Sequence, residues 1–236
     1  MVKKKKFVVI LQARMGSTRL KGKILKRIKN KSILEILILR LKRSKKVSNI
    51  IVATTKKKQD DKIVDFCKNN NIDYFRGPER NVLKRYYLTS KKFKIKNIVR
   101  ITSDCPLVDP GLIDSFICKF QRKKNLQYLS NVNPPTFPNG FDIEVFTFKI
   151  LEYFYNKKLS SYEKEHVTVK MKKSKFKKFN VLNNVDLSKF RITIDDKKDY
   201  FFFKNLFRHF NYNYNVKFDK IINLISNKPT FFNKDI

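Results

Sequence analysis

Residues 7–23 read FVVILQARMGSTRLKGK, and this stretch is the strongest indication of the fold class. Residues 7–12 are predicted to form the first strand, because the short apolar run from Phe7 to Leu11 is typical of a buried strand. A polar loop follows, and an amphipathic helical pattern then begins at about residue 32 and runs to residue 43. A strand, a loop and a helix in this order indicate a parallel sheet, in which ligands bind beyond the carboxyl ends of the strands.

The rest of the chain continues the alternation of strand and helix patterns. Further strands are predicted at residues 49–54, 73–75, 97–102, 142–148 and 191–194. Further helices are predicted at residues 60–69, 79–90, from about 110, 149–157, 163–172 and 198–210. This order predicts an α/β fold of three layers, with a mostly parallel, twisted sheet covered by helices.

A chain of 236 residues suits one α/β domain with a small appendage. We expect a main domain over residues 1–212 and a C-terminal tail or helix over residues 213–236. Residues 133–140, NPPTFPNG, can form neither a helix nor a central strand. They predict a long functional loop or lid within a small lid or dimerisation excursion at about residues 131–172.

The chain carries 55 Lys and Arg against 20 Asp and Glu, a net charge of +35. Such a charge can indicate nucleic-acid binding. Lysine, however, is spread through the whole chain together with Asn, Ile and Phe, whose codons are AT-rich, so a biased genome explains much of the excess. We therefore do not expect nucleic acid as a partner.

Other features of the composition indicate a cytoplasmic protein. No apolar run approaches the ~18 residues of a membrane span, so we expect no membrane partner. The basic start is followed by an apolar run that is too short for a signal peptide. The cysteines, Cys67, Cys105 and Cys118, are odd in number and lack metal-ligand spacing, which predicts reduced, structural thiols.

The loop after the first strand has the groups needed to hold a polyphosphate. Two glycines allow close approach of the backbone, Ser17 and Thr18 offer hydroxyls, and four cations lie between residues 14 and 23. It is not a Walker A loop, because Gly16 to Gly22 is one residue too long and Ile24 stands where a Ser or Thr must bind the metal. The alternative is a solvated basic turn in an already basic protein.

Residues 12–23 resemble the opening motif of the cytidylyltransferases that make CMP-activated sugar acids, and are most similar to the branch named after the spore coat polysaccharide biosynthesis protein SpsF. Further blocks look like that branch in the same order: VATT (52–55), FRG (75–77), NVLKRYY (81–87), RITSDCPL (100–107), GFDIEVF (140–146), EHVT (165–168) and RITID (191–195). The resemblance covers about residues 7–210. It implies the Rossmann-like nucleotide-diphospho-sugar transferase fold, the use of CTP and, as in many relatives, a homodimer.

The resemblance also implies a nucleotide site. Its catalytic residues would be Arg14, Lys23 and Asp104, with Arg14, Ser17 and Lys23 holding the triphosphate. Arg80 could serve the phosphates or merely cap the exposed face of its helix. The expected nucleotide-binding residues are, in full, Gln12, Ala13, Arg14, Gly16, Ser17, Arg19, Lys23, Thr54, Arg80, Arg100 and Ser103.

The chain departs from the family pattern at three places. Lys21 replaces a proline, and Asp196-Lys197 replaces Thr-Pro. Ser103 replaces a glycine and puts a side chain beside Asp104, where it could narrow the site or donate a hydrogen bond to a phosphate.

Two aspartates are candidate ligands for Mg²⁺, which prefers a few carboxylates plus substrate oxygens. Asp104 ends a buried strand at the ligand-binding edge, and Asp195 ends another strand and could converge on the same ion. The resemblance implies the same pair. Asp104 could instead be an N-cap or turn residue before Pro106, and Asp195 the N-cap of the following helix.

The acceptor side has four candidate residues. Asp142 and Glu144 alternate on one face of a strand, where they could bind the acceptor or form a solvated edge pair. His166 could orient the acceptor, act as a base or be structural. Arg191 completes this set.

These observations predict a Mg²⁺-dependent cytidylyltransferase that transfers CMP from CTP to a small acidic, sugar-acid or phosphate acceptor and releases pyrophosphate, for surface polysaccharide or glycan biosynthesis. A rival is a nucleotide-sugar-dependent glycosyltransferase, which usually has Asp-x-Asp where this chain has Asp104-Cys105-Pro106. A second rival is a basic RNA-binding protein, which would need aromatic and basic residues interleaved on a sheet face.

Overall fold

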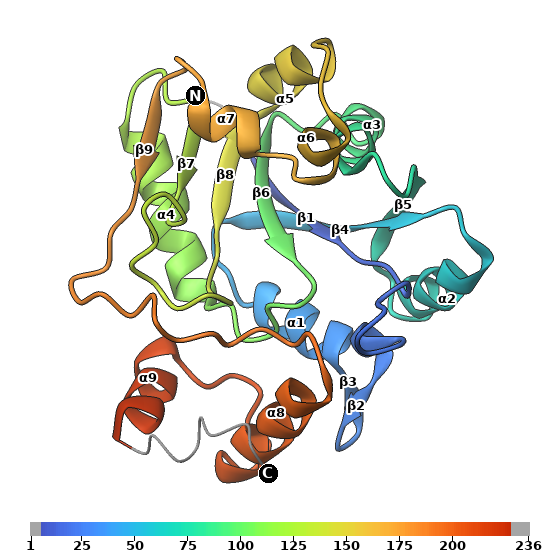
Figure 1. Cartoon of the computed structure of the whole chain (residues 1–236), viewed down its shortest axis with the longest axis vertical. Coiled ribbons are helices and arrows are strands. Elements are labelled where there is room, and N and C mark those ends of the chain that lie inside the picture. Colours follow the sequence, from blue (N-terminus) through green and yellow to red (C-terminus); the bar gives the residue numbers. More distant parts are fainter. Residues whose placement is uncertain (1–5, 228–236) are drawn as a thin grey trace.

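The computed structural model describes residues 6–227, which form a central seven-stranded sheet with helices on both faces (Figure 1). The order of the strands is β5-β4-β1-β6-β8-β7-β9. All of them run in one direction except β8, which is antiparallel to both of its neighbours. The bounds are β1 (Phe7–Gln12), β4 (Val47–Thr55), β5 (Asp73–Gly77), β6 (Asn97–Thr102), β7 (Tyr128–Ser130), β8 (Glu144–Thr147) and β9 (Lys178–Asn180).

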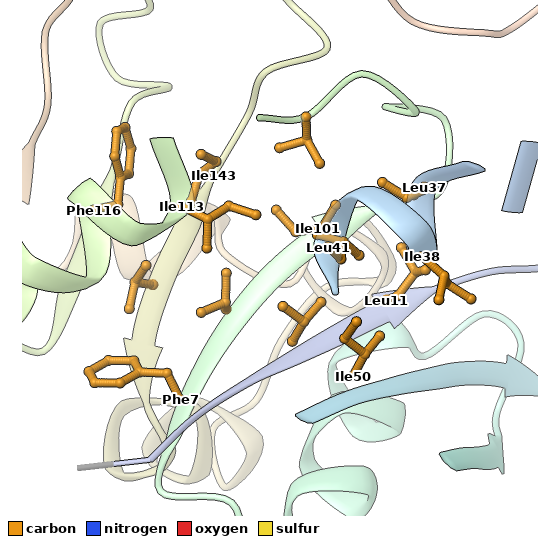
Figure 2. Packing of buried hydrophobic residues seen from close by; sticks show 14 of the residues in the cluster. Phe7, Leu11, Leu37, Ile38, Leu41, Ile50, Ile101, Ile113, Phe116 and Ile143 are labelled. Carbon is orange, nitrogen blue, oxygen red and sulfur yellow. The ribbon is translucent and has the colours of Figure 1, made fainter. Parts of the chain in front are cut away.

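The apolar run of β1 is explained by its central place, because it is paired with β4 on one side and β6 on the other. Val9 and Leu11 face the core formed with α1 (Ile33–Leu41), α2 (Asp61–Asn69) and α4 (Pro110–Arg122), part of which Figure 2 shows. Ile10 faces the opposite core, formed with α3 (Val82–Lys92) and α5 (Phe148–Tyr155). Successive strand residues therefore enter two separate cores, which confirms the predicted three layers.

A third apolar cluster holds the C-terminal helices, α8 (Lys197–His209) and α9 (Phe218–Asn227), against the small hairpin of β2 (Arg27–Ile28) and β3 (Lys31–Ser32). Arg40 of α1 is fully buried beside this cluster. Its guanidinium donates hydrogen bonds to the backbone carbonyls of Leu107, Val108, Tyr214 and Val216. One side chain thus ties α1 to the segment after β6 and to the segment that leads into α9.

The structure corrects the predicted strand at residues 191–194. This segment makes only an isolated bridge, between Arg191 and Asn139. Its backbone N–H groups bond to two different loops, since Ile192 donates to the carbonyl of Asn139 and Ile194 to that of Asp104. Because no single strand offers both acceptors, an extended ladder does not form.

Other element boundaries also differ from the prediction. The helix expected at residues 163–172 is split into α6 (Ser161–Glu165) and α7 (Val169–Lys173), since the chain leaves the helix at His166 and turns Val167 and Thr168 into the core. The helix expected from residue 79 begins at Val82 behind the cap Asn81. Strand β8 begins at Glu144 instead of Asp142, and β7 and β9 were not predicted.

The C-terminal prediction of a tail or helix is resolved in part. Residues 218–227 form α9, whereas residues 228–236 lie outside the described part of the chain. No helix between residues 6 and 227 has the length and apolar character needed to cross a bilayer.

Candidate active site

The loop after β1 lies at the carboxyl end of the parallel strands and is built around the backbone of Met15. The Met15 carbonyl accepts hydrogen bonds from the N–H groups of Ser17 (2.9 Å) and Gly22 (3.4 Å). Gly22 has a left-handed φ of 63°, which a glycine adopts without steric cost, and turns the chain into the short 3-10 helix η1 (Lys23–Leu25). The loop therefore delivers Lys23 at a fixed position.

Lys23 connects three segments that are distant in the sequence. Its ammonium donates to the carbonyl of Ile194 (2.8 Å) and to Oδ1 of Asp195 (3.0 Å), and lies 3.7 Å from Oδ2 of Asp104. The Lys23 side chain is only 14% exposed. The structure thus brings together the predicted catalytic lysine and both predicted metal ligands.

Neither Asp104 nor Asp195 has the capping role that was considered for it, but Asp104 does lie in a turn, which Cys105 closes by donating its N–H to the carbonyl of Thr102. Asp109, not Asp104, caps α4, by accepting from the N–H groups of Gly111 and Leu112. Asp196, not Asp195, caps α8. The Asp104 carboxylate lies 3.7 Å from the Lys23 ammonium and accepts a weak hydrogen bond from the thiol of Cys105 at 3.6 Å.

The carboxylate of Asp195 is surrounded by cations. Besides Lys23, it lies 3.2 Å from Arg19 and 3.5 Å from Arg191, and it accepts a hydrogen bond from the hydroxyl of Thr193. Burial works to raise the pKa of Asp195, but the hydrogen bond and the charge of Lys23 outweigh it and hold the pKa below its usual value. Asp195 is therefore ionised at neutral pH, as a carboxylate that binds a metal would have to be.

These donors fit Mg²⁺ as an ion shared with a substrate. Asp104 and Asp195 converge on one cation, the ammonium of Lys23. Between residues 6 and 227, no three His, Cys, Asp or Glu side chains are grouped so as to hold a metal by themselves. Mg²⁺ commonly uses one or two carboxylates and takes its other ligands from phosphates and water.

The remaining cations of the predicted nucleotide site are more exposed. Arg14 lies 3.7 Å from Glu165 of α6, with both side chains about half exposed. Arg19 is largely exposed beside Asp195. Arg80 is exposed and precedes α3, so it does not lie on the face of that helix. Gly16 and Ser17 are partly exposed in the loop.

Other predicted nucleotide residues lie in or next to the ends of the strands, and Ala13, Thr54 and Ser103 are buried there. Ala13 donates its N–H to the carbonyl of Ala53, and Ser103 is buried next to Asp104. Gln12 accepts a hydrogen bond from Arg100 at 3.4 Å. Thr54 is fully buried, and its hydroxyl has no hydrogen-bond partner within residues 6–227. Thr54 therefore differs from the residues of the loop after β1 in that its side chain is not accessible from solvent.

Glu144 is the centre of a buried polar network. Strand β8 lies between β6 and β7, so Glu144 is 2% exposed and cannot belong to a solvated edge pair. Its carboxylate accepts from Arg100 and from the hydroxyl of Tyr128, and lies 3.6 Å from the ammonium of Lys172. Burial raises the pKa of Glu144, but the charges of Arg100 and Lys172 outweigh it, so the pKa is lowered.

Asp142 lies next to this network, just before β8. Burial, followed by the negative charge of Glu144, raises the pKa of Asp142 to about 6. The negative charge of Asp104 also raises the pKa of Asp142, so both Asp104 and Glu144 act on this carboxyl group. A carboxyl group with this pKa can gain or lose a proton near neutral pH.

The last two acceptor candidates lie in different surroundings. His166 is exposed at the end of α6, with its ring 4.4 Å from that of Tyr162. Arg191 bonds to Asp199 of α8 at 2.7 Å and contacts Asp195, so the structure groups it with the Lys23 carboxylates.

Sequence reasoning missed Tyr128, Lys172, Asp199 and Asp60 as parts of this site. Tyr128 belongs to a three-residue strand, which is too short for a periodic signal. Lys172 is one of many lysines in its segment. Asp199 had a usable signal, since Asp196 and Asp199 form a capping box at the start of α8.

A mostly parallel α/β sheet with a basic loop after its first strand and paired carboxylates opposite that loop is an arrangement suited to an enzyme that acts on a phosphorylated nucleotide. The family is more specific. The chain belongs to the cytidylyltransferase family, whose model matches residues 8–235. It is therefore a CTP-dependent nucleotidyltransferase, as the motifs predicted.

Individual relatives are similar over nearly the whole chain. An uncharacterised protein of Methanocaldococcus jannaschii is 40% identical, over 97% of this chain and 93% of the relative. The spore coat polysaccharide biosynthesis protein SpsF of Bacillus subtilis is 31% identical, over 93% of this chain and 94% of the relative. The structure of a cytidylyltransferase from Leptospira borgpetersenii matches with a TM-score of 0.91, 36% identity and 96% coverage of both chains.

Proposed function

We propose that this enzyme transfers CMP from Mg²⁺-bound CTP to a small acidic, sugar-acid or phosphate acceptor and releases pyrophosphate, in the synthesis of a surface polysaccharide or glycan. The observation that carries the proposal is Lys23, held between Asp104 and Asp195 at the end of a basic loop. The name of the SpsF relative supports a role in polysaccharide synthesis.

The reaction forms a bond between an acceptor oxygen and the α-phosphorus of CTP, and breaks the bond from that phosphorus to the oxygen of the β-phosphate. Its main requirement is alignment and neutralisation of negative charge. Mg²⁺ held by Asp104 and Asp195 would supply a Lewis acid for the phosphate oxygens. Lys23, Arg14 and Arg19 would orient the triphosphate, with the fixed ammonium of Lys23 nearest to the two carboxylates.

The acceptor would bind on the side of Asp142 and the Glu144 network. If its attacking group is a hydroxyl, the proton needs a base whose pKa is near the working pH. Asp142, with a pKa of about 6, meets that requirement, and Glu144, with a lowered pKa, does not. Lys172 offers an ammonium group to an acidic acceptor, because Arg100 already neutralises the Glu144 carboxylate that it contacts.

A thermal-shift panel tests the nucleotide part of the proposal. CTP, ATP, GTP, UTP and UDP-sugars are each added with and without Mg²⁺, because a ligand that binds only the folded state raises Tm. We expect a Mg²⁺-dependent rise with CTP that exceeds the rise with the other nucleotides. A rise with a UDP-sugar and none with any triphosphate would favour a glycosyltransferase instead. Pyrophosphate release in a screen of acidic acceptors then tests the transfer itself.

A further inference from the structure

Asp60 anchors the loop after β1 to the rest of the protein. It is the last residue of the 3-10 helix η2 (Lys58–Asp60) that follows β4, and it is 1% exposed. Its Oδ1 accepts the N–H of Met15 at 2.7 Å, from 45 residues away in the sequence. Its Oδ2 accepts the hydroxyl of Thr55 at the end of β4. The carboxylate therefore joins the loop to a central strand.

The position of Asp60 would normally give it another task. It occupies the N-cap of α2, where an aspartate usually accepts an N–H from the first turn of its own helix. Asp60 makes no such bond. Both of its oxygens are bonded to Met15 and Thr55 instead, so the placement of this side chain serves the loop and not the helix.

Met15 is the residue through which this anchor reaches the whole loop. Its N–H is held by Asp60, and its carbonyl holds the N–H groups of Ser17 and Gly22. Three hydrogen bonds thus meet at one peptide segment in the middle of the loop. The residues on either side, from Arg14 to Lys23, are those expected to contact the triphosphate.

We propose that Asp60 is a positioning residue that holds this loop in the shape that binds the β- and γ-phosphates of CTP. The inference rests on the proposed function, because it takes the loop to be the triphosphate site. Without Asp60 the Met15 N–H would lose its acceptor, and the loop would be less ordered in the free protein. Part of the binding free energy of CTP would then be used to order the loop, so the affinity for CTP would fall. Asp60 does not touch the substrate and acts only through Met15.

The experiment compares CTP with CMP, which lacks the β- and γ-phosphates. Dissociation constants for both nucleotides are measured by calorimetry, in Mg²⁺, for the wild-type chain and for Asp60→Ala and Asp60→Asn. The control is Asp65→Asn, an exposed aspartate of the same helix α2. A residue that only stabilises the fold would weaken CTP and CMP binding equally, so the ratio of the two constants reports positioning.

We expect Asp60→Ala to weaken CTP binding by about tenfold or more, the loss typical of a hydrogen bond to a charged group, and to leave CMP within about twofold. Asp60→Asn keeps an oxygen for the Met15 N–H and should recover most of the CTP affinity. Asp65→Asn should bind both CTP and CMP with the affinity of the wild type. With an acceptor in hand, Asp60→Ala should raise the KM for CTP and leave the KM for the acceptor unchanged.

An unchanged ratio of CTP to CMP affinity in Asp60→Ala would overturn the proposal. If that variant does not fold, Thr55→Val replaces it, because it removes the hydroxyl that holds Oδ2 of Asp60 and leaves the Met15 bond in place. Thr55→Val should weaken CTP binding by about threefold and leave CMP binding unchanged, and an equal loss of affinity for both nucleotides would again overturn the proposal. A wild-type chain that binds no Mg²⁺–CTP would instead refute the function on which the inference depends.

Discussion

Replacing Gly140 with alanine should displace Asp195, although the two residues are distant in the sequence. Gly140 has a φ of 112°, and the backbone of residues 139–140 lies directly against the segment that leads to Asp195. Asn139 donates to the carbonyl of Phe190 and accepts from the N–H of Ile192. A Cβ atom on residue 140 would lie 2.3 Å from the carbonyl oxygen of Ile192 and 2.7 Å from its carbon.

The size of the effect follows from these distances. Carbon atoms in contact are ordinarily about 3.5–4.0 Å apart, so one of the two segments must move by about 1 Å. The positive φ costs about 1–3 kcal/mol for a residue other than glycine, and the overpacking about 1–3 kcal/mol more. The total of about 2–6 kcal/mol corresponds, for a domain of this size, to a fall in Tm of about 4–24 °C. A misplacement of about 1 Å at the Asp195 carboxylate can lower turnover by about a hundredfold.

The assay combines a melting curve with calorimetric titration of Mg²⁺ and CTP. We expect Gly140→Ala to melt earlier and, below its Tm, to bind Mg²⁺–CTP at least about tenfold more weakly, because Asp195 no longer meets Lys23 and Asp104. The control is Gly111→Ala in α4, where φ is not in the left-handed region and the nearest atom is a side-chain oxygen. Wild-type stability and wild-type affinity in Gly140→Ala would refute the link between this glycine and the metal site.

Three other changes have expected outcomes. Asp104→Asn should keep the wild-type Tm but lose the Mg²⁺-dependent rise with CTP and lower kcat by about 10²–10³-fold, and near-normal turnover would exclude Asp104 as the metal ligand. Asp142→Asn should mainly weaken use of the acceptor. It should also change the pH dependence of stability, because burial raises the pKa of Asp142 in the folded state to about 6. The Asp142 carboxyl therefore lowers the free energy of unfolding of the wild type as pH rises from about 4 to about 7, and the variant lacks this effect. Chemical unfolding at both pH values measures the difference in the free energy of unfolding between variant and wild type. This difference should shift in favour of the variant by up to about 2–3 kcal/mol at the higher pH, and a constant difference would contradict the raised pKa. Arg40→Met should lower the free energy of unfolding in urea by about 3–5 kcal/mol, because four backbone carbonyls lose their donor. The control Arg43→Met changes an exposed residue of the same region and should lower it by less than about 0.5 kcal/mol.

The parallel half of the sheet could be predicted from the sequence because its strands are buried on both faces. Residues 7–12 and 97–102 are strands with the predicted bounds, since both segments are short, rich in Val and Ile and bounded by polar residues. The other half could not be predicted. Strands β7 and β9 have three residues each and depend on pairing with distant segments, which no local pattern records.

The candidate site was predictable for Lys23 and Asp104, which follow strands β1 and β6, whereas Asp195 was predicted from a strand at residues 191–194 that does not form. Lys23, Asp104 and Asp195 lie after β1, after β6 and in the segment bonded to Asp104, and the structure brings them together. The partners that hold these residues were not predictable. Asp60 resembles an ordinary helix cap in the sequence, and only the fold shows that its carboxylate is bonded to Met15.

Lys23 also determines the charge of the site before any substrate binds. In the free protein its ammonium is the counter-ion of Asp104 and Asp195, and its positive charge offsets the repulsion between the two carboxylates before substrate binds. If Asp104 and Asp195 hold Mg²⁺ when CTP binds, as proposed, the metal would replace one cation at these carboxylates with another, and the Lys23 ammonium would already lie beside the phosphates. A site prepared in this way would need little rearrangement on binding, so less of the binding energy would be lost in ordering it.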